Sequence, residues 1–185
     1  VLCKRSPDKC ASHIASMVDI AMRGTERGIP NSGRAVAHLF ARLPRHCQGA
    51  ILTRLSAKQA AYLVSWLGSK RAAIAMAAAV AEGGGAAGNA FAAATIEALE
   101  EIGFEGEGGG AGGAAAALLA AMHDEDPDAA AGALGALDPE FAAAAVAGIP
   151  PRVAASLANG VKDPTVVAAM LEEMEKVGSA ATEES

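Results

Sequence analysis

The stretch that decides the fold is DPDAAAGALGALDPEFAAAAVAGIPPRVAASLANGVKDP, which occupies residues 126–164. Four of its five prolines, Pro127, Pro139, Pro151 and Pro164, lie at intervals of 12, 12 and 13 residues. Proline fits the first turn of a helix, because the N–H that it lacks would have no partner there. An aspartate in front of that proline is a good N-cap at the positive end of the helix. Each interval therefore predicts one short helix of two to three turns, followed by a tight turn.

The same interval appears earlier in the chain, where Leu43, Leu55 and Leu67 are also 12 residues apart. A shift of 94 residues superimposes the two regions: Leu43, Leu55, Ala60, Ala61, Leu63, Leu67 and Met76 fall on Leu137, Ile149, Ala154, Ala155, Leu157, Val161 and Met170. Helices this short are unstable alone and must stack on neighbours. No long period-two alternation predicts a sheet. We therefore expect an all-α protein, an α-solenoid or superhelical bundle of short helices with two pseudo-duplicated lobes.

Composition and charge divide the chain into four parts. We expect a basic helical lobe at 1–81, a glycine-rich linker at 82–113, an acidic helical repeat lobe at 114–178 and a polar tail at 179–185. Within the linker, one helix is predicted over 89–102, with Asn89 as its N-cap and Gly103 at its C-terminal end. The glycine runs on either side of this helix are typical of flexible connections.

The charge is strongly segregated along the sequence. Residues 1–80 contain 12 Lys and Arg against 3 Asp and Glu, whereas residues 81–185 contain 3 against 18. This asymmetry indicates either a polarised interaction surface or two lobes that attract each other within one molecule. The basic lobe also contains the single Trp and the single Tyr.

We expect the basic lobe to dock a protein partner in a larger complex, because Arg, Trp and Tyr dominate interface hot spots. Nucleic acid is not the expected partner, since the basic residues are spread along the lobe with few aromatic residues near them. Tyr62 and Trp66 are four residues apart and share a helical face, so they can equally anchor the core of the lobe. The candidate partner-binding residues are Arg42, Arg45, Arg54, Lys58, Tyr62 and Trp66.

A family resemblance follows from the repeat itself. The runs LDPEFAA at 137–143 and IPPRVAASL at 149–157 resemble the repeats of MgtE N-terminal-type domains, and FliG-type flagellar rotor domains are built on similar superhelices of short helices. The resemblance covers residues 118–174 and, more faintly, 36–80. It implies a right-handed superhelix used for interaction or regulation rather than catalysis. In the magnesium-channel members, acidic residues of this domain help to sense divalent cations.

Two clusters contain residue types that bind metal ions. Cys3, Cys10 and His13 could hold zinc, but Cys3 and Cys10 could equally form a disulfide or remain free thiols. The second cluster contains the carboxylates of Asp124, Glu125, Asp126 and Asp128, which are suitable ligands for Ca²⁺ or Mg²⁺. Acidic residues at this place can also simply cap the following helix.

The sequence contains no recognisable catalytic constellation. No serine lies in a G-x-S-x-G context, and the glycine runs lack the G-K-[ST] of a phosphate-binding loop. The hydrophobic fraction is 52%, but alanine makes up about half of it and aromatic residues are only 3% of the chain, which excludes a large aromatic-lined pocket. No uncharged stretch is long and apolar enough to cross a bilayer. The chain begins at Val1 rather than at a methionine, which fits a processed organellar or exported protein as well as a trimmed chain.

We therefore expect a soluble, non-catalytic structural or protein-interaction subunit that needs no cofactor. The alternative is a divalent-cation-sensing regulatory module related to MgtE N-terminal domains.

Overall fold

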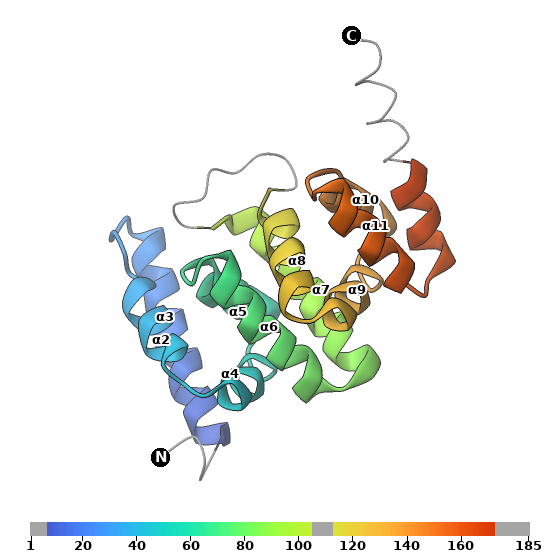
Figure 1. Cartoon of the computed structure of the whole chain (residues 1–185). Coiled ribbons are helices and arrows are strands. Elements are labelled where there is room, and N and C mark those ends of the chain that lie inside the picture. Colours follow the sequence, from blue (N-terminus) through green and yellow to red (C-terminus); the bar gives the residue numbers. More distant parts are fainter. Residues whose placement is uncertain (1–6, 105–112, 173–185) are drawn as a thin grey trace.

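The protein is all-α across residues 7–104 and 113–172, which are the residues that this computed structural model describes (Figure 1). Within these ranges it contains helices joined by turns and no strand. The helices are α2 (Pro7–Glu26), α3 (Arg34–Ala41), α4 (Arg45–Leu52), α5 (Ala57–Ser65), α6 (Ser69–Gly83), α7 (Gly85–Ile102), α8 (Gly113–Glu125), α9 (Pro127–Leu134), α10 (Pro139–Ala147) and α11 (Pro151–Gly160). Residues 164–172 are also helical. The predicted fold class is confirmed.

The prolines of the repeat begin helices, as their spacing predicts. Pro127, Pro139 and Pro151 are the first residues of α9, α10 and α11, and Pro164 is the first residue of the helix 164–172. The prediction of one short helix for each interval is therefore confirmed.

The aspartates in front of three of these prolines are N-caps. Asp126 Oδ1 accepts a hydrogen bond from the backbone N–H of Ala129 at 3.0 Å. Asp138 Oδ1 accepts from the N–H groups of Glu140 and Phe141, at 3.0 and 3.3 Å. The third cap, Asp163, accepts from the N–H of Thr165 at 2.8 Å. These bonds satisfy backbone donors that a helix leaves unpaired in its first turn.

The helix boundaries repeat with the period found in the sequence. The helices α3, α4, α5 and α6 begin 93 to 95 residues before α9, α10, α11 and the helix 164–172, respectively. Four of the superimposed pairs are buried in both copies: Leu55 with Ile149, Ala60 with Ala154, Leu63 with Leu157 and Met76 with Met170. The duplication is therefore a repeat of structure as well as of sequence.

The two copies also pack in the same way. In the first, α2 packs against α3, α4 and α5; in the second, α8 packs against α9, α10 and α11. α3 contacts α5 as α9 contacts α11. We call α2–α6 the first module, and α8–α11 together with residues 164–172 the second module. The second module rests on the first, because α8 and α9 both pack against α6.

The helix α7 lies between the modules and packs against both of them, whereas the sequence predicted a helix within a flexible linker. It begins at Gly85 rather than after Asn89, and it packs against α5 and α6 of the first module and α8 and α9 of the second. Only Gly84 separates it from α6. At Gly88, a Cβ atom would lie 2.3 Å from the carbonyl oxygen of Val80, so the missing side chain lets the two helices approach closely. These glycines therefore form a tight hairpin rather than a spacer.

The C-terminal end of α7 follows the prediction, since the helix ends at Ile102 and Gly103 has a φ of +74°. The second glycine run, at 105–112, lies outside the described residues.

The core consists of alanines and of aliphatic side chains distributed over both modules. Its largest fully buried side chains are Phe40, Ile51, Leu52, Leu63, Met76, Ile96, Leu99, Leu118, Leu119, Met122, Leu134 and Leu157. Among the described helices, none combines the length and the hydrophobicity that crossing a membrane would require.

Candidate protein-interaction site

The six predicted partner-binding residues lie on α3, α4 and α5 or on the turns next to them. Arg42 follows α3, Arg45 begins α4 and Arg54 lies two residues beyond its end. Lys58 and Tyr62 belong to α5, and Trp66 follows it. The four basic residues are exposed, whereas Tyr62 is buried and Trp66 is half-buried. The basic side chains of this set are therefore at the surface, whereas the two aromatic side chains are wholly or partly covered.

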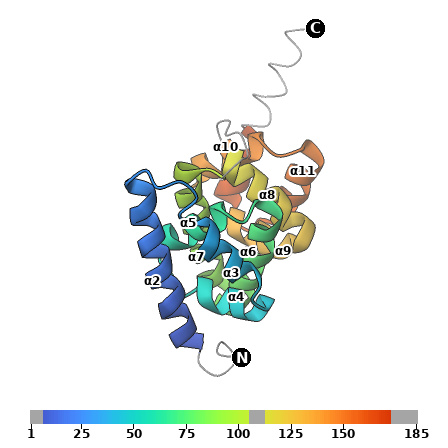
Figure 2. The ribbon, with the colours of Figure 1, turned by 90° about the vertical axis from the view of Figure 1, so that its left-hand side faces the viewer.

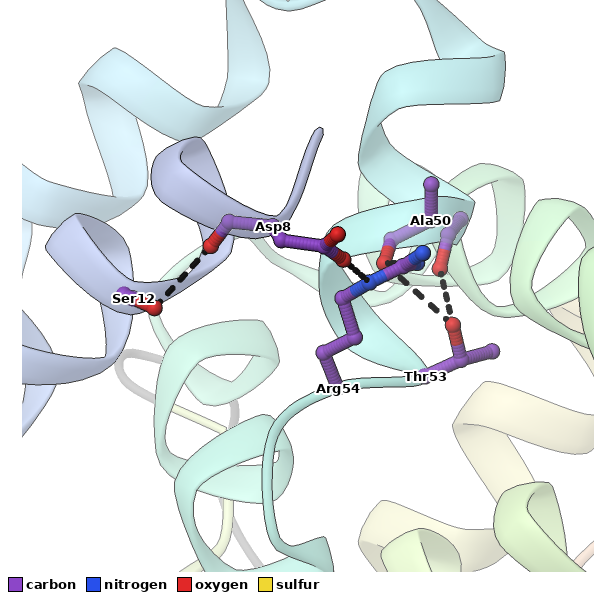
Figure 3. A network of polar contacts seen from close by, with 6 residues as sticks. Asp8, Ser12, Ala50, Thr53 and Arg54 are labelled. Carbon is purple, nitrogen blue, oxygen red and sulfur yellow. Dashed lines mark hydrogen bonds and ion pairs between the residues drawn. The ribbon is translucent and has the colours of Figure 1, made fainter. Parts of the chain in front are cut away.

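Arg54 is tied to its own module (Figure 3). Its Nε donates to Asp8 Oδ1 on α2 at 2.6 Å, and its Nη1 donates to the carbonyl oxygen of Ala50 on α4 at 2.6 Å. The Asp8 side chain is 81% exposed, so this pair contributes little to stability. Arg54 therefore joins α2 to α4, and much of its hydrogen-bonding capacity is already used.

Arg45 connects the two modules. Its Nη1 donates to Glu125 Oε1 at the end of α8. Within the described residues, this is the ion pair that joins the basic half of the chain to the acidic half. The expected attraction between the lobes is therefore present, but among the described cations of the basic half only Arg45 takes part in it.

Tyr62 and Trp66 anchor the first module. The Tyr62 hydroxyl oxygen lies 2.7 Å from Thr25 Oγ1 and 3.2 Å from Ser32 Oγ, which ties α5 to the end of α2 and the loop after it. The Trp66 ring stands edge-on to Tyr62, with centroids 6.3 Å apart, and a Cβ on Gly33 would lie 2.1 Å from its Nε1. Tyr62 is only 6% exposed. It is a core residue, so its expected place among the partner contacts is corrected.

The exposed arginines border a hollow of about 250 Å³ between α3, α4 and α6. We call it the basic hollow; Ala41, Leu43, Arg45, Gln48, Leu67, Arg71 and Ile74 line it. Its walls are aliphatic, and two guanidinium groups contribute to its lining. Sequence reasoning identified Leu43 and Leu67 as markers of the repeat but not as parts of a hollow. Arg71 was missed as a site residue, because only the tertiary packing brings α6 next to Arg45 on α4. Gln48 lies one turn after Arg45 on α4 and was missed because its residue type alone does not indicate a site.

Gln48 fixes the shape of the hollow. It is 7% exposed, and its Nε2 donates to the carbonyl oxygens of Phe40 and Leu43 at 3.2 and 3.0 Å. These bonds hold the turn between α3 and α4 in place, because both carbonyl groups lie at the end of α3 or in that turn. The hollow is therefore a feature of the folded first module, with its polar group anchored to the backbone.

The basic half retains a large unpaired positive charge. Among the described residues of this half, only Arg45 and Arg54 form ion pairs. The other cations are exposed and have no carboxylate partner within the described ranges: Lys9, Arg23, Arg27, Arg34, Arg42, Lys58, Lys70 and Arg71. Such a set of side chains creates a positive field that attracts acidic partners.

The predicted Cys3, Cys10 and His13 cluster is described only in part. Cys10 is disulfide-bonded, while Cys3 lies outside the described residues, so the pairing of these two cysteines stays a prediction. His13 is exposed, and its Nδ1 donates to the carbonyl oxygen of Lys9 at 2.7 Å. A sulfur in a disulfide is not a thiolate and does not ligate zinc. The third cysteine, Cys47, is buried and free.

The four predicted cation ligands do not converge. Glu125 binds Arg45, Asp126 caps α9, and Asp124 and Asp128 are exposed. Across residues 7–104 and 113–172, no group of three or more His, Cys, Asp or Glu side chains is placed to hold a metal ion. The capping interpretation of this cluster therefore accounts for Asp126, and the ion pair accounts for Glu125.

His123 lies beside this cluster and joins α8 to α11. Its Nε2 is 2.9 Å from Ser156 Oγ, and its Nδ1 is 3.9 Å from Asp124 Oδ1. The second distance is too long for a hydrogen bond. The three side chains therefore lack the connected chain of hydrogen bonds by which a histidine and an acid activate a serine.

A second, larger hollow of about 570 Å³ lies between the start of α7, α9 and the turn after α11. Ala86, Asn89, Asp128, Ala131, Gly132, Gly135, Ala136, Gly160, Lys162 and Asp163 line it. Its walls are mostly alanine and glycine, and its charged groups have opposite signs. This mixture does not point to one class of ligand.

No protein-family model, curated protein or solved structure matches this chain. The resemblance to MgtE N-terminal-type and FliG-type domains therefore stays a prediction from the sequence.

Proposed function

We propose that the protein is a non-catalytic interaction subunit that binds an acidic segment of a partner protein through the basic hollow. The observation that carries this proposal is the position of Arg71. Arg71 lines a mainly aliphatic hollow, and its guanidinium has no carboxylate partner among the described residues. A partner segment with an aliphatic side chain next to a carboxylate could fill the hollow with the first and pair with Arg71 through the second.

The neighbouring ion pair supports this assignment. Arg45, on the same hollow, already binds the carboxylate of Glu125 from the same chain. An arginine that lines the hollow can therefore pair with a carboxylate in the folded protein. Arg71 offers a second planar donor of the same kind, suited to bidentate recognition of an acidic side chain.

The surrounding charge supports an acidic partner rather than a neutral one. Arg42 and Lys70 are exposed next to lining residues of the hollow, and neither forms an ion pair within the described part of the chain. Unpaired surface charges of one sign accelerate association and select partners of the opposite sign.

The test is a binding measurement with a defined probe. A fluorescent helical peptide built from Glu and Leu is titrated with the protein, and the same peptide with Lys in place of Glu serves as the reference. We expect the acidic peptide to bind, and the variant Arg42→Glu/Arg71→Glu to bind it at least about tenfold more weakly, which corresponds to about 1.4 kcal/mol. Arg45 is left intact, because its replacement would also remove the ion pair between the modules.

Arg152→Glu is the matched control, since Arg152 is exposed but belongs to the second module. Binding should also weaken between about 50 and 500 mM salt, as the Debye length shortens. Equal binding of the two peptides, or full binding by the folded double variant, would contradict the proposal. Displacement of the peptide by duplex DNA at low stoichiometry would indicate a nucleic-acid surface instead.

A further inference from the structure

The ends of the stacked modules carry large apolar side chains that are exposed. In the described residues, the exposed large hydrophobic side chains are Ile20, Ile29, Leu39, Ile102 and Leu171. Ile20, Ile29 and Leu39 belong to α2, α3 and the loop between them, and Leu171 belongs to the helix 164–172. These elements form the two opposite edges of the molecule (Figure 1), and α2 and α3 face the viewer in Figure 2.

At the first edge, the repeat shows that a partner is missing. Leu39 on α3 is 50% exposed, whereas the residue 94 positions later, Ala133 on α9, is fully buried. The difference arises because α9 packs against α6 of the first module and against α7. α3 is the corresponding helix of the first module, and no described helix precedes that module to cover it.

The opposite edge shows the complementary situation. Leu171 is 55% exposed, whereas its counterpart 94 positions earlier, Ala77 on α6, is buried. α6 packs against α8 and α9 of the following module. The helix 164–172 occupies the place of α6 in the second module, and no described helix follows it in the chain as α8 follows α6. Terminal repeats of stacked proteins usually have polar outer faces, so a large aliphatic residue at both edges is unusual.

The two edges belong to parts of the chain with opposite charge. Residues 7–80 contain ten basic and three acidic side chains, whereas residues 113–172 contain two basic and eight acidic ones. Arg23, Arg27 and Arg34 surround the first edge and form no ion pair with the described residues. Like edges therefore repel each other, and unlike edges attract.

We propose that the protein associates with itself head to tail, the edge formed by α2 and α3 of one copy docking on the helix 164–172 of the next. Within one chain, α8 and α9 of the second module pack on α6 of the first. In the proposed contact, α2 and α3 of one copy pack on the helix 164–172 of another copy in the same way. Because the interface joins two different surfaces, it leaves one free edge at each end and can add further copies.

This contact is separate from the basic hollow. Leu39 and Ala41 are two residues apart on α3, so their side chains point about 200° apart. Ala41 lines the hollow, and Leu39 lies on the exposed face of the helix. A failure of self-association therefore leaves the proposed binding of an acidic partner untouched, and the reverse also holds.

The experiment uses the full chain and measures its mass by light scattering and sedimentation over a wide range of concentration. We expect the mass of the wild-type protein to rise with concentration and to fall as salt increases from about 50 to 500 mM. Leu39→Gln and Leu171→Gln should each weaken association at least about tenfold, a factor equivalent to about 1.4 kcal/mol. Ile102→Gln is the matched control, because Ile102 is exposed at the end of α7, an element that belongs to neither edge, and its replacement should leave the association unchanged.

Mixing the two edge variants gives the decisive result. The Leu39→Gln protein retains an intact edge at the helix 164–172, and the Leu171→Gln protein retains an intact edge at α2 and α3. One molecule of each variant should therefore form a pair, and no third molecule should add to it. A wild-type protein that stays monomeric at every concentration would overturn the proposal. Unchanged association of Leu171→Gln, or a mixture that forms no pairs between the two variants, would also overturn it, since a symmetric contact through Leu39 alone lets Leu171→Gln pair only with itself.

Discussion

Gly49 sets the distance between α4 and α6, which pack closely in the first module. A Cβ atom at this position would lie 2.4 Å from the carbonyl oxygen of Ala78 and 2.7 Å from its carbonyl carbon. These are backbone atoms, so the neighbour cannot move aside without shifting α6. The absence of one methyl group therefore determines how closely two helices of the core approach.

Gly49→Ala should lower the free energy of unfolding by about 1–3 kcal/mol, the usual cost of overpacking a core. The measurement is the midpoint of thermal and urea unfolding. Gly113→Ala is the control, because a Cβ there meets nothing within 4 Å, and alanine favours the helix α8 by up to about 1 kcal/mol. Equal unfolding midpoints for Gly49→Ala and Gly113→Ala would contradict the close approach of α4 and α6 at Gly49.

At the scale of the helix, the starting points are determined by local chemistry. Asp138 holds two N–H groups of α10, and Ser56 and Gln59 form a capping box at α5. These signals depend on residues close together in the sequence, which is why the proline and aspartate spacing predicted the helices of the second module.

Asp138→Ala should destabilise the protein by about 0.5–2 kcal/mol, the range found for the loss of an N-cap. Glu97→Ala removes the same charge from the exposed face of α7 without removing a cap, and it should have a much smaller effect. The comparison is made by thermal unfolding at one pH and salt concentration. Equal losses in the two variants would show that charge, rather than capping, is responsible.

The features that the sequence did not predict depend on contacts between distant residues. Asn89 fits an N-cap by its type, yet α7 continues four residues further towards Gly85, because Gly88 packs on Val80 of α6. Similarly, Arg71 became a site residue only when folding placed it beside Arg45 and Gln48. Tyrosine is a residue type that is common at interfaces, and only the contacts of Tyr62 with Thr25 and Ser32 show that it belongs to the core.

At the scale of the molecule, α7 makes the two modules one structure. It packs against two helices of each module, and α8 and α9 also pack directly on α6. Two lobes joined by a flexible linker would unfold independently, whereas modules that both pack against one helix should lose their structure together.

We therefore expect a single unfolding transition for the whole chain. Trp66 is the single tryptophan and reports only on the first module, whereas far-ultraviolet circular dichroism reports on every helix. The two signals should give the same midpoint in urea and on heating. A helical signal that persists after the change in tryptophan fluorescence would show that the second module folds without the first.

The alanine content of the core has a calorimetric consequence. The heat capacity change of unfolding follows the apolar area that becomes exposed to water, and an alanine exposes less of it than a leucine or a phenylalanine. A core in which helices meet through alanine and glycine should therefore give a small heat capacity change for its length. The free energy of unfolding of such a protein varies gently with temperature. The protein should therefore resist cold denaturation better than a protein of equal stability with a leucine-rich core.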